Sequence, residues 1–432
     1  ASLIRNNGDG TFTDVTYETG LMEHLYPTQA SVFADFNNDG WLDIYFGNET
    51  RRDTEKYPCE LFLSDGKGKF KNVAKEAGAD ILCFAKGVAA SDYNNDGYMD
   101  ICISSQGTEN FLLRNDTGKN GGKIKFTDVT KEAGVGLPIK SFPVAFLDFN
   151  NDGWQDLTIQ TYDAENCDYD NAAEYFNKPV KGEYSILYKN NGDGTFTDIT
   201  KEMNMQVAMT VMGLSFGDLD NDGWMDIYSG TGTPNYTSLV PKRMFRNNEG
   251  KSYQDITHSG GFGHLQKGHG IGFGDVDNDG DQDVYEDMGG GYEGDGFQGA
   301  FYENPGISGN NWVSLQLVGV KANKSAMGSK VKITVENADK PTRDIYVEVT
   351  NGGSFGVNSN RLEAGLGKAV AIKAIEINWL GPNQKQIITG VPMNSFVKIT
   401  EGEAAFEILP LKCYKFAAMP MDTMMMHHGH QM

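Results

Sequence analysis

The sequence predicts an all-β protein: a β-propeller of five to seven blades, then a small antiparallel β domain and an ordered C-terminal tail. Two observations support this fold class. The 432 residues include 53 glycines and 11% aromatic residues, a composition typical of short strands joined by tight turns. A nine-residue acidic motif and an Asn/Gly hairpin motif also alternate along the chain. We expect the propeller at residues 1–305, the β domain at 306–402 and the tail at 403–432.

The acidic motif reads Asp-x-Asx-x-Asp-Gly-x-x-Asp and occurs five times. Successive copies begin 57, 56, 70 and 57 residues apart, at Asp35, Asp92, Asp148, Asp218 and Asp275. Strand-like segments such as SVFADF and LDIYFGN flank the copies. A four-stranded unit of about 57 residues has the size of a propeller blade. The longer third interval contains an insertion at residues 163–184.

The hairpin motif places two short strands around an Asn/Gly turn. Its best copies are LIRNNGDGTFTDVT from Leu3 and LYKNNGDGTFTDIT from Leu187, and looser copies begin at Leu61, Leu112 and Met244. The first copy resembles the second half of a blade whose first half is missing. Ring closure from the end of the array could supply that half, and so could another subunit.

The acidic motif has the spacing of a calcium loop. Oxygen donors stand at positions 1, 3, 5 and 9, position 7 offers a backbone carbonyl, and glycine at position 6 permits a sharp turn. Hard oxygen ligands at this density favour calcium over magnesium. We therefore predict about five calcium ions. The predicted ligands are, loop by loop, Asp35, Asn37, Asp39, Trp41 and Asp43; Asp92, Asn94, Asp96, Tyr98 and Asp100; Asp148, Asn150, Asp152, Trp154 and Asp156; Asp218, Asp220, Asp222, Trp224 and Asp226; and Asp275, Asp277, Asp279, Asp281 and Asp283.

Two other interpretations compete with a calcium loop. An EF-hand needs flanking helices and a glutamate at position 12, but position 12 counted from Asp35 is Phe46 and the flanks resemble strands. A metal-free Asn/Asp/Gly turn explains one copy easily, but five copies with aspartate at position 9 favour a metal. The aromatic side chains at position 7 are expected to pack within the blades rather than contact a ligand.

Charge and cysteine content limit the partners and the compartment. With 37 basic and 59 acidic residues the formal charge is −22, which should repel nucleic acid and anionic membranes.

We find no apolar run of transmembrane length, and the chain opens at Ala1 on a strand pattern, so we expect a mature extracellular or cell-surface protein. Five cysteines form no CxxC pair; ordinary buried thiols are expected, although Cys83 and Cys102 could face each other.

The motifs resemble those of a known family. Repeats of DxNxDGxxD, with FGD at Phe216–Asp218 and Phe273–Asp275, are similar to the FG-GAP/VCBS repeats of integrin α-subunit propellers. SAMGSKVKITV from Ser325, NGGSFGVNSNRLEAGLG from Asn351 and AIEINWLGPNQKQIITGV from Ala374 resemble the ASPIC/UnbV domain found in relatives of cartilage acidic protein. This resemblance implies a propeller with calcium in its loops, and a protein that is extracellular and without a defined activity.

The C-terminal tail is rich in methionine and histidine. We expect it to dock on this chain or on a neighbouring subunit, because methionine is a flexible gap-filler. The alternative is a copper site, since thioether and imidazole groups are soft ligands. The candidate copper ligands are Met419, Met421, Met424, Met425, Met426, His427, His428 and His430.

The sequence contains neither an HExxH motif nor a P-loop. His24, His264 and His269 could converge near the propeller axis, but structural roles are expected for them. We therefore predict that the protein is not an enzyme. It is expected to be a calcium-stabilised scaffold that binds protein or glycan and that adheres or self-assembles as a homo-oligomer through its N-terminal hairpin and its tail. The alternative is a polysaccharide lyase or hydrolase on a calcium propeller.

Overall fold

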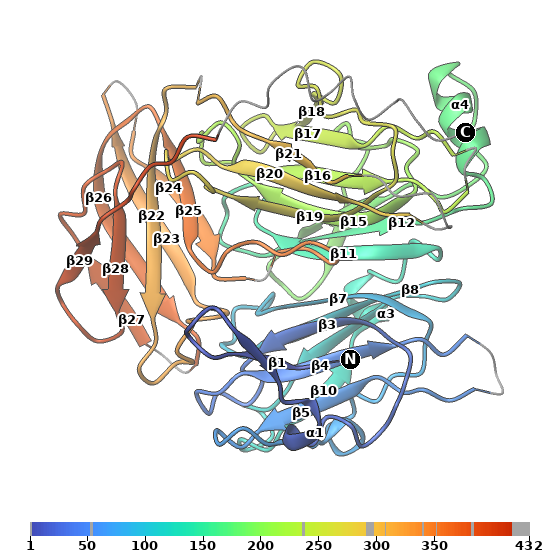
Figure 1. Cartoon of the computed structure of the whole chain (residues 1–432), viewed down its shortest axis with the longest axis horizontal. Coiled ribbons are helices and arrows are strands. Elements are labelled where there is room, and N and C mark those ends of the chain that lie inside the picture. Colours follow the sequence, from blue (N-terminus) through green and yellow to red (C-terminus); the bar gives the residue numbers. More distant parts are fainter. Residues whose placement is uncertain are drawn as a thin grey trace.

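The computed structural model describes residues 2–51, 55–235, 238–290, 298–306, 308–338, 341–350, 352–381 and 384–416. Over these ranges the chain is all-β, as the sequence predicts, and it forms a propeller with a two-sheet domain beside it (Figure 1). Of the tail expected at 403–432, residues 403–416 are described, and they contribute a strand (Phe406–Leu409) to a sheet of the C-terminal domain. The candidate copper ligands, within residues 417–432, lie outside the described residues.

Four blades are complete, and each contains four antiparallel strands in chain order. Their first strands contact one another from blade to blade and line the propeller axis. In blades 2 and 3 the first strand is buried along nearly its whole length, because the neighbouring blades cover both of its faces. The strands are β3 (Thr28–Ala34), β4 (Asp43–Asn48), β5 (Glu60–Ser64) and β6 (Phe70–Asn72) in blade 1; β7 (Ala85–Ser91), β8 (Asp100–Ser105), β9 (Phe111–Asn115) and β10 (Phe126–Asp128) in blade 2; β11 (Ser141–Leu147), β12 (Asp156–Thr161), β13 (Ile186–Asn190) and β14 (Phe196–Asp198) in blade 3; and β15 (Val211–Gly217), β16 (Asp226–Thr231), β17 (Arg243–Asn247) and β18 (Tyr253–Asp255) in blade 4.

The two ends of the array are incomplete within the described residues. Blade 5 has three strands, β19 (Gly268–Gly274), β20 (Asp283–Met288) and β21 (Ala300–Tyr302). The N-terminal hairpin, β1 (Ile4–Asn6) and β2 (Phe12–Asp14), forms a two-stranded sheet of its own. Leu3 packs against Ile44 and Phe62 of blade 1, so the hairpin takes the place of the outer half of a further blade.

Short helices connect the outer strand of one blade to the first strand of the next. They are α1 (Thr16–Thr19), α2 (Ala74–Ala77) and α3 (Thr130–Ala133). Each ends at a glycine with positive φ, at Gly20, Gly78 and Gly134, which is the left-handed cap that glycine adopts without strain. A fourth helix, α4 (Cys167–Tyr175), lies in the insertion of blade 3. None of the helices in the described ranges is long and apolar enough to cross a membrane.

The C-terminal domain is a sandwich of two four-stranded sheets, ordered β25-β22-β28-β29 and β24-β23-β26-β27. Their inner faces enclose one apolar core, with Leu315, Ile333 and Ile377 at its centre. The antiparallel expectation is wrong for one pair: β22 and β28 run parallel, which the long connection between them allows. The strands are β22 (Asn311–Val318), β23 (Lys330–Asn337), β24 (Arg343–Glu348), β25 (Leu362–Gly367), β26 (Ala369–Trp379), β27 (Gln384–Ile388), β28 (Phe396–Thr400) and β29 (Phe406–Leu409).

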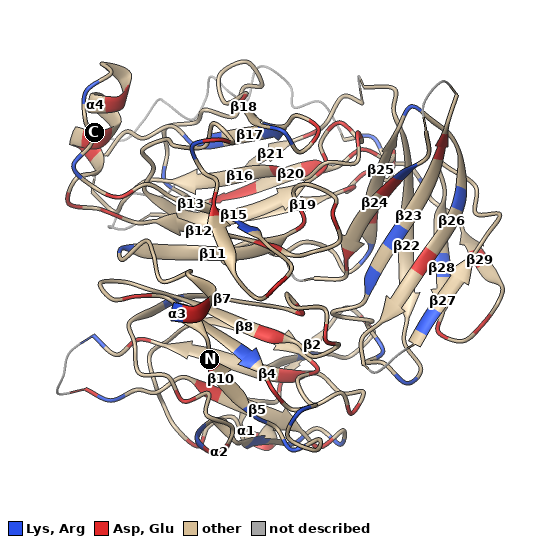
Figure 2. Ribbon diagram, turned by 180° about the vertical axis from the view of Figure 1, so that it is seen from behind, with Lys and Arg blue, Asp and Glu red and all other residues tan. Residues whose placement is uncertain are grey.

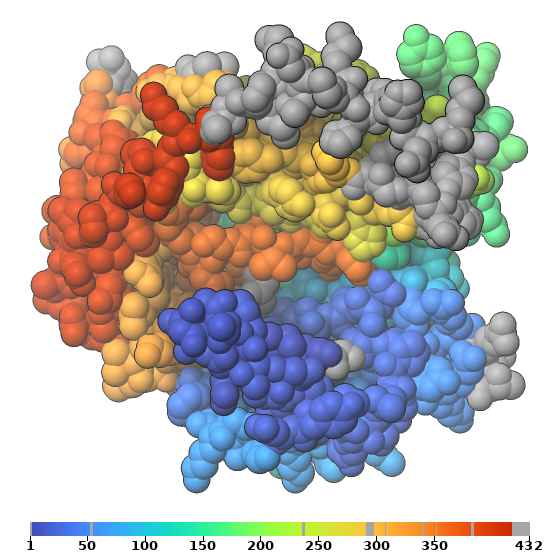
Figure 3. All heavy atoms as spheres, viewed as in Figure 1, coloured from blue at the N-terminus to red at the C-terminus, as the bar shows by residue number. Residues whose placement is uncertain are grey.

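A loop of the C-terminal domain enters the propeller axis. Its Ser354 backbone N–H donates to the Val144 carbonyl of β11 (3.2 Å), and its Phe355 carbonyl accepts from Ile271 of β19 (3.0 Å). This axis loop, residues 352–358, appears in orange between the blue N-terminal blades and the yellow fifth blade (Figure 3). It therefore joins blades that are far apart in sequence.

The cysteines are free thiols, buried except for Cys413. The expectation of ordinary buried thiols is confirmed for four of them, and Cys83 does not face Cys102. The thiol of Cys83 instead hydrogen-bonds to that of Cys59, which lowers the pKa of Cys59. Cys59 precedes β5, and Cys83 lies just before β7 of the next blade. Cys102, on β8, packs instead in the core between blades 2 and 3.

Candidate metal loops

Each acidic motif forms a loop between the first and second strands of its blade, and its own hydrogen bonds turn the oxygen donors inward. In the first loop the Asp35 carboxylate accepts the N–H groups of Asp39 (3.1 Å) and Gly40 (2.9 Å). Asn37 also accepts from Asp39 (3.1 Å), and Asp39 accepts from Trp41 (3.0 Å). The other four loops repeat this pattern. The sequence spacing therefore yields five similar oxygen-lined turns.

The aspartate at position 9 ties each loop to the third strand of its blade. Asp43 accepts the N–H of Phe36 on one oxygen (3.0 Å) and that of Ser64 on the other (2.8 Å). Equivalent bonds recur in the other loops. A carboxylate oxygen has two lone pairs, so these bonds leave acceptor capacity for a cation.

Carboxylate oxygens converge most closely in the fourth and fifth loops, where aspartate replaces asparagine at position 3. Oxygens of Asp218, Asp220 and Asp222 lie within 4.8 Å of one another, and so do those of Asp275, Asp277 and Asp279. Cationic side chains approach both clusters. Arg246 pairs with Asp222 (3.3 Å) and with Asp220, and Arg361 pairs with Asp275 (3.1 Å).

Burial raises the pKa of the loop carboxylates. It raises the pKa of Asp35 to about 6, of Asp148 to about 7 and of Asp43 to about 8, and neighbouring aspartates add to the effect. The pKa values of Asp218 and Asp226 rise well above the usual range for the same reason. Buried carboxylates with this electrostatic environment favour either a proton or a bound cation.

Asparagine at position 4 has a role that the sequence analysis missed. Asn38 has a left-handed backbone (φ 57°), and its amide donates to the Gly97 carbonyl of the next loop (2.9 Å). Asn95, Asn151 and Asn221 link the following loops in the same way. These bonds join the loops into a chain. The signal was present in the sequence, since asparagine fills position 4 in all five copies.

The C-terminal domain sits on the loop face of the propeller. Arg343 donates to the Asp222 carbonyl (2.7 Å), Arg361 donates to Asn278 (2.8 Å), and Lys330 donates to the Asp92 carbonyl. Figure 2 shows acidic residues at strand ends along this boundary. The candidate metal loops are therefore also the interface between the two domains.

Glu348 lies in this interface, and its ionisation should make the stability of the protein depend on pH. It is buried at the end of β24, where Ser91 of blade 2 donates to its carboxylate (2.9 Å), and burial raises its pKa to about 7. An acid whose folded pKa exceeds its unfolded value near 4.5 destabilises the fold progressively as pH rises from about 4.5 to 7. Glu348→Gln should therefore stabilise the protein at pH 8, by up to a few kcal/mol, and leave it nearly unchanged at pH 4.

Denaturant unfolding at pH 4 and pH 8 measures this difference. Glu407→Gln is the matched control, because Glu407 is exposed on β29 of the same domain. Equal unfolding free energies for Glu348→Gln and the parent at pH 8 would contradict the assignment.

The aromatic side chains at position 7 pack against the outer turns of their own blades, as expected, and Trp41 remains 54% exposed there. Trp41 lies so close to the outer hairpin of its blade that a Cβ on Gly66 would come within 2.5 Å of the indole. Tyr98, Trp154 and Trp224 cover Gly118, Gly192 and Gly250 in the same way. Glycine at these turns thus makes room for the ring of the neighbouring loop.

The three histidines do not converge. His24 bonds to Glu60 (3.2 Å) and stacks on Tyr26. His264 precedes blade 5, and its carbonyl accepts from the Lys242 backbone (3.3 Å). His269 does reach the axis, where its ring contacts Phe355 of the axis loop, with 5.2 Å between centroids. The expectation of structural roles agrees with these contacts.

Comparison with known proteins identifies both parts of the chain. Residues 1–46, 92–159 and 180–229 match the FG-GAP-like repeat, and residues 319–406 match the ASPIC and UnbV domain. Human cartilage acidic protein 1 is 28% identical over 243 residues, which is 55% of this chain and 32% of the human protein. The mouse protein is 27% identical over 246 residues, 55% of this chain and 33% of its own length. The chain thus spans about a third of the length of these relatives.

Solved structures give weaker likenesses. The Vibrio cholerae biofilm matrix protein Bap1 covers 84% of this chain and 72% of its own, with 11% identity and a TM-score of 0.28. The Dos1 propeller covers 81% and 76%, with 10% identity and a TM-score of 0.30. These TM-scores are too low for a functional conclusion. The family matches carry the assignment: the chain contains FG-GAP-like repeats followed by an ASPIC and UnbV domain, and it is homologous to cartilage acidic protein 1 over about half of its length.

Proposed function

We propose that this protein is an extracellular scaffold that calcium stabilises and that works by binding rather than by catalysis. The observation that carries the proposal is the repeated loop: five turns of the same geometry gather buried carboxylates beneath the C-terminal domain. The homology to cartilage acidic protein 1 supports an extracellular matrix setting.

Calcium suits the donor set of these loops. Each offers carboxylate and amide oxygens at positions 1, 3, 5 and 9 and a carbonyl at position 7, and oxygen-only ligation by six to eight groups is the preference of calcium. Five ions would add ten positive charges to a chain of formal charge −22. They would also supply the counter-charge that the buried carboxylates of the first three loops need.

Calcium stoichiometry tests the metal assignment directly. Isothermal titration of chelator-treated protein with calcium should give about five ions per chain, with magnesium binding much more weakly. Metal analysis after gel filtration in millimolar calcium provides a second count. A stoichiometry below one ion per chain would refute the assignment.

Assays with glycans distinguish a binding protein from a polysaccharide-degrading enzyme. We expect retention of specific glycans or matrix proteins on an array and no shortening of polysaccharide chains in a depolymerisation assay. Calcium-dependent depolymerisation would instead make the protein a lyase or hydrolase. Self-assembly stays a prediction, and light scattering of the whole chain tests it. Copper binding by residues 417–432 also stays a prediction.

A further inference from the structure

The five acidic loops share one geometry, but the residue beside each loop on the third strand of its blade differs. In every blade the aspartate at position 9 accepts the N–H of one residue at the end of that strand. The residue just before it in the chain is, in blades 1 to 5, Leu63, Arg114, Lys189, Arg246 and Glu303. The charge at this one position therefore varies from blade to blade.

In blade 4 the arginine at this position bonds to the candidate calcium ligands. The Nε of Arg246 donates to the Asp220 carboxylate (2.6 Å), and its Nη2 donates to the Asp222 carboxylate (3.3 Å). These aspartates stand at positions 3 and 5 of the fourth loop, where one oxygen of each lies within 4.8 Å of an oxygen of Asp218. The guanidinium group therefore occupies acceptor oxygens that calcium would need.

The first and third loops have no such arginine. Blade 1 has Leu63 at the position, and blade 3 has Lys189, whose ammonium group lies 3.9 Å from Asp152, beyond hydrogen-bond reach. Among the described residues, ion pairs reach loop carboxylates in the third, fourth and fifth loops only. The ligand oxygens of the first loop are thus free of any competing lysine or arginine in that part of the chain.

The second loop shows why the arginine of blade 4 reaches its ligands. Arg114 has the same place on its strand but bonds to Asp116, two residues further on, through Nε (2.8 Å) and Nη2 (3.1 Å). In blade 4 the residue two positions on is Asn248, which carries no charge. Position 3 of the loop is Asn94 in blade 2 but Asp220 in blade 4. Two local differences therefore hold one arginine away from its loop and direct the other onto its loop.

The C-terminal domain adds cations to three loops, but it leaves positions 3 and 5 free. Lys330 and Arg343 donate to backbone carbonyls of the second and fourth loops. Arg361 lies 3.1 Å from the position 1 aspartate of the fifth loop, but it also pairs with Glu363 (2.7 Å), which balances its charge. The third-strand residue of blade 5 is Glu303, which repels position 3 of that loop rather than neutralising it. The fourth loop therefore differs from the others in its direct competitor.

We propose that Arg246 makes the fourth loop the weakest of the five calcium sites, because the ion enters only when the guanidinium group leaves Asp220 and Asp222. The inference rests on the proposed calcium binding and specifies how the loops differ. The displaced side chain keeps a partner, since its Nη1 already bonds to Gln254 on the adjacent strand (3.4 Å) and the side chain is 36% exposed. As calcium rises, the other loops fill first and the fourth loop fills last.

Hydrogen exchange of the whole chain over a series of calcium concentrations gives a separate midpoint for each loop. The midpoint of the fourth loop, residues 218–226, should lie about tenfold or more above those of the first three loops, because a cation beside the site opposes the ion. Arg246→Leu should lower this midpoint by about tenfold and leave the midpoints of residues 35–43 and 148–156 unchanged. Leucine suits the position because blade 1 has Leu63 there.

Removal of calcium gives the opposite effect at the same residue. In excess chelator the amides of Asp222 and Gly223, which bond to Asp218 (2.9 and 2.7 Å), should exchange faster in Arg246→Leu than in the parent. The reason is that the substitution removes the counter-charge that the empty loop keeps in the parent.

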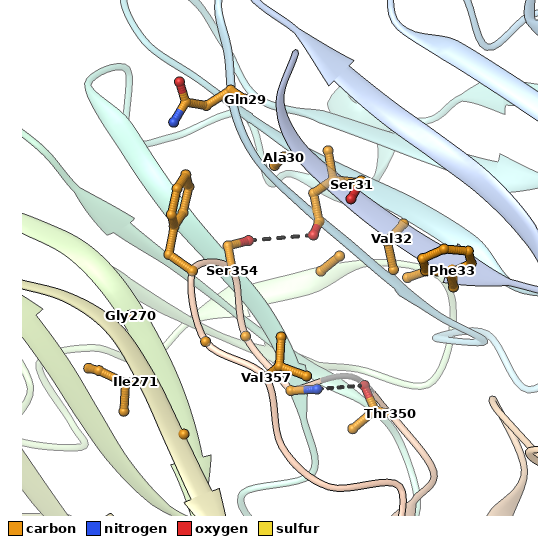
Figure 4. Close-up of a pocket in the computed structure, with 18 of the residues that line it drawn as sticks. Gln29, Ala30, Ser31, Val32, Phe33, Gly270, Ile271, Thr350, Ser354 and Val357 are labelled. Atoms are coloured by element: carbon orange, nitrogen blue, oxygen red, sulfur yellow. Dashed lines mark hydrogen bonds between the residues drawn. The ribbon is translucent and has the colours of Figure 1, made fainter. Parts of the chain in front are cut away.

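Two controls accompany the variant. Arg114→Leu removes an arginine from the same strand position of blade 2 and should leave the midpoint of residues 92–100 unchanged, because Arg114 bonds outside its loop. The axis loop reports on the overall fold. Figure 4 shows it along the cavity between blades 1 and 5, where the Ser354 hydroxyl donates to the Val88 carbonyl (3.4 Å). Its exchange should be the same in the parent and in both variants at each calcium concentration.

The outcomes distinguish this inference from calcium binding itself. If the first three loops respond to calcium and the fourth loop of the parent has an equal or lower midpoint, the inference is wrong and calcium binding stands. The same holds if Arg246→Leu leaves the midpoint of the fourth loop unchanged. If exchange in none of the loops depends on calcium, the calcium proposal fails and this inference fails with it.

Discussion

Removal of calcium is expected to lower the melting temperature by about ten degrees or more. A site held at a hundredfold excess of ligand over its dissociation constant stabilises the folded state by about 2.7 kcal/mol, and the chain has five such loops. Without the ion, each loop holds three or four carboxylates close together, several of them buried. Differential scanning fluorimetry in millimolar calcium and in excess chelator measures the shift.

One loop can be tested against a matched substitution in the same blade. Asp152→Asn keeps the acceptor for the Trp154 N–H (3.0 Å) but removes a ligand charge from the third loop. It should lose one ion in titration and reduce the effect of chelator. Asp193→Asn makes the same chemical change in the exposed outer turn of blade 3 and should change neither quantity. Equal melting temperatures with and without chelator would contradict the proposal for all loops.

A control at matched ionic strength distinguishes calcium binding in the loops from general screening of charge repulsion by salt. Sodium chloride at the same ionic strength as the calcium buffer weakens repulsion between exposed charges but does not fill a loop. We therefore expect salt to restore little of the stability that chelation removes. Magnesium should also restore little, because its smaller octahedral shell suits these loops poorly.

The strands and turns within each blade could be predicted from the sequence because the same motif occurs five times. Strand pairs on either side of each acidic motif follow from alternating apolar residues and turn glycines, and the structure confirms them. The weakness of the last hairpin, FYENPG, corresponds to the missing fourth strand in the described part of blade 5. Short-range patterns therefore gave the blades and their connections.

The long-range part could not be predicted. The NGGSFGVN segment has the turn residues of an ordinary surface loop, yet Ser354 and Phe355 bond to blades 3 and 5 in the axis. Arg343 and Arg361 hold the C-terminal domain against the metal loops, but neither arginine lies in a recognisable sequence motif. Contacts between residues 83 or more positions apart, as these are, leave no periodic signal in a single sequence.

The role of asparagine at position 4 was overlooked for a different reason. The spacing of oxygen donors points to positions 1, 3, 5 and 9, but position 4 is also the same residue, asparagine, in all five copies. A left-handed backbone favours asparagine, and its amide can reach a neighbouring carbonyl. Uniformity at a position with no ligand role was thus a usable sign of a contact between blades.

Loss of Lys242 is expected to destabilise the propeller strongly, and in a pH-dependent way. Its ammonium group lies 3.7 Å from the Glu286 carboxylate between blades 4 and 5, and both side chains are 0% exposed. Tyr228 donates to the other Glu286 oxygen (2.9 Å). Burial raises the pKa of Glu286 and lowers that of Lys242. Breaking a buried pair by removing one member costs about 3–5 kcal/mol, because the remaining charge is left without a partner.

The Lys242→Met variant should therefore lose about 3 kcal/mol or more at pH 8, where Glu286 would otherwise be ionised. The loss should be smaller at pH 5, because a buried carboxyl with a raised folded pKa takes up a proton as pH falls and then no longer needs a counter-charge. Lys242→Met combined with Glu286→Gln removes both charges and keeps an acceptor for Tyr228, so it should recover most of the stability at pH 8. Denaturant unfolding of the parent, both single variants and the double variant at the two pH values measures the coupling. If the double variant is no more stable than Lys242→Met at pH 8, the ion pair is not what holds blades 4 and 5 together at this point.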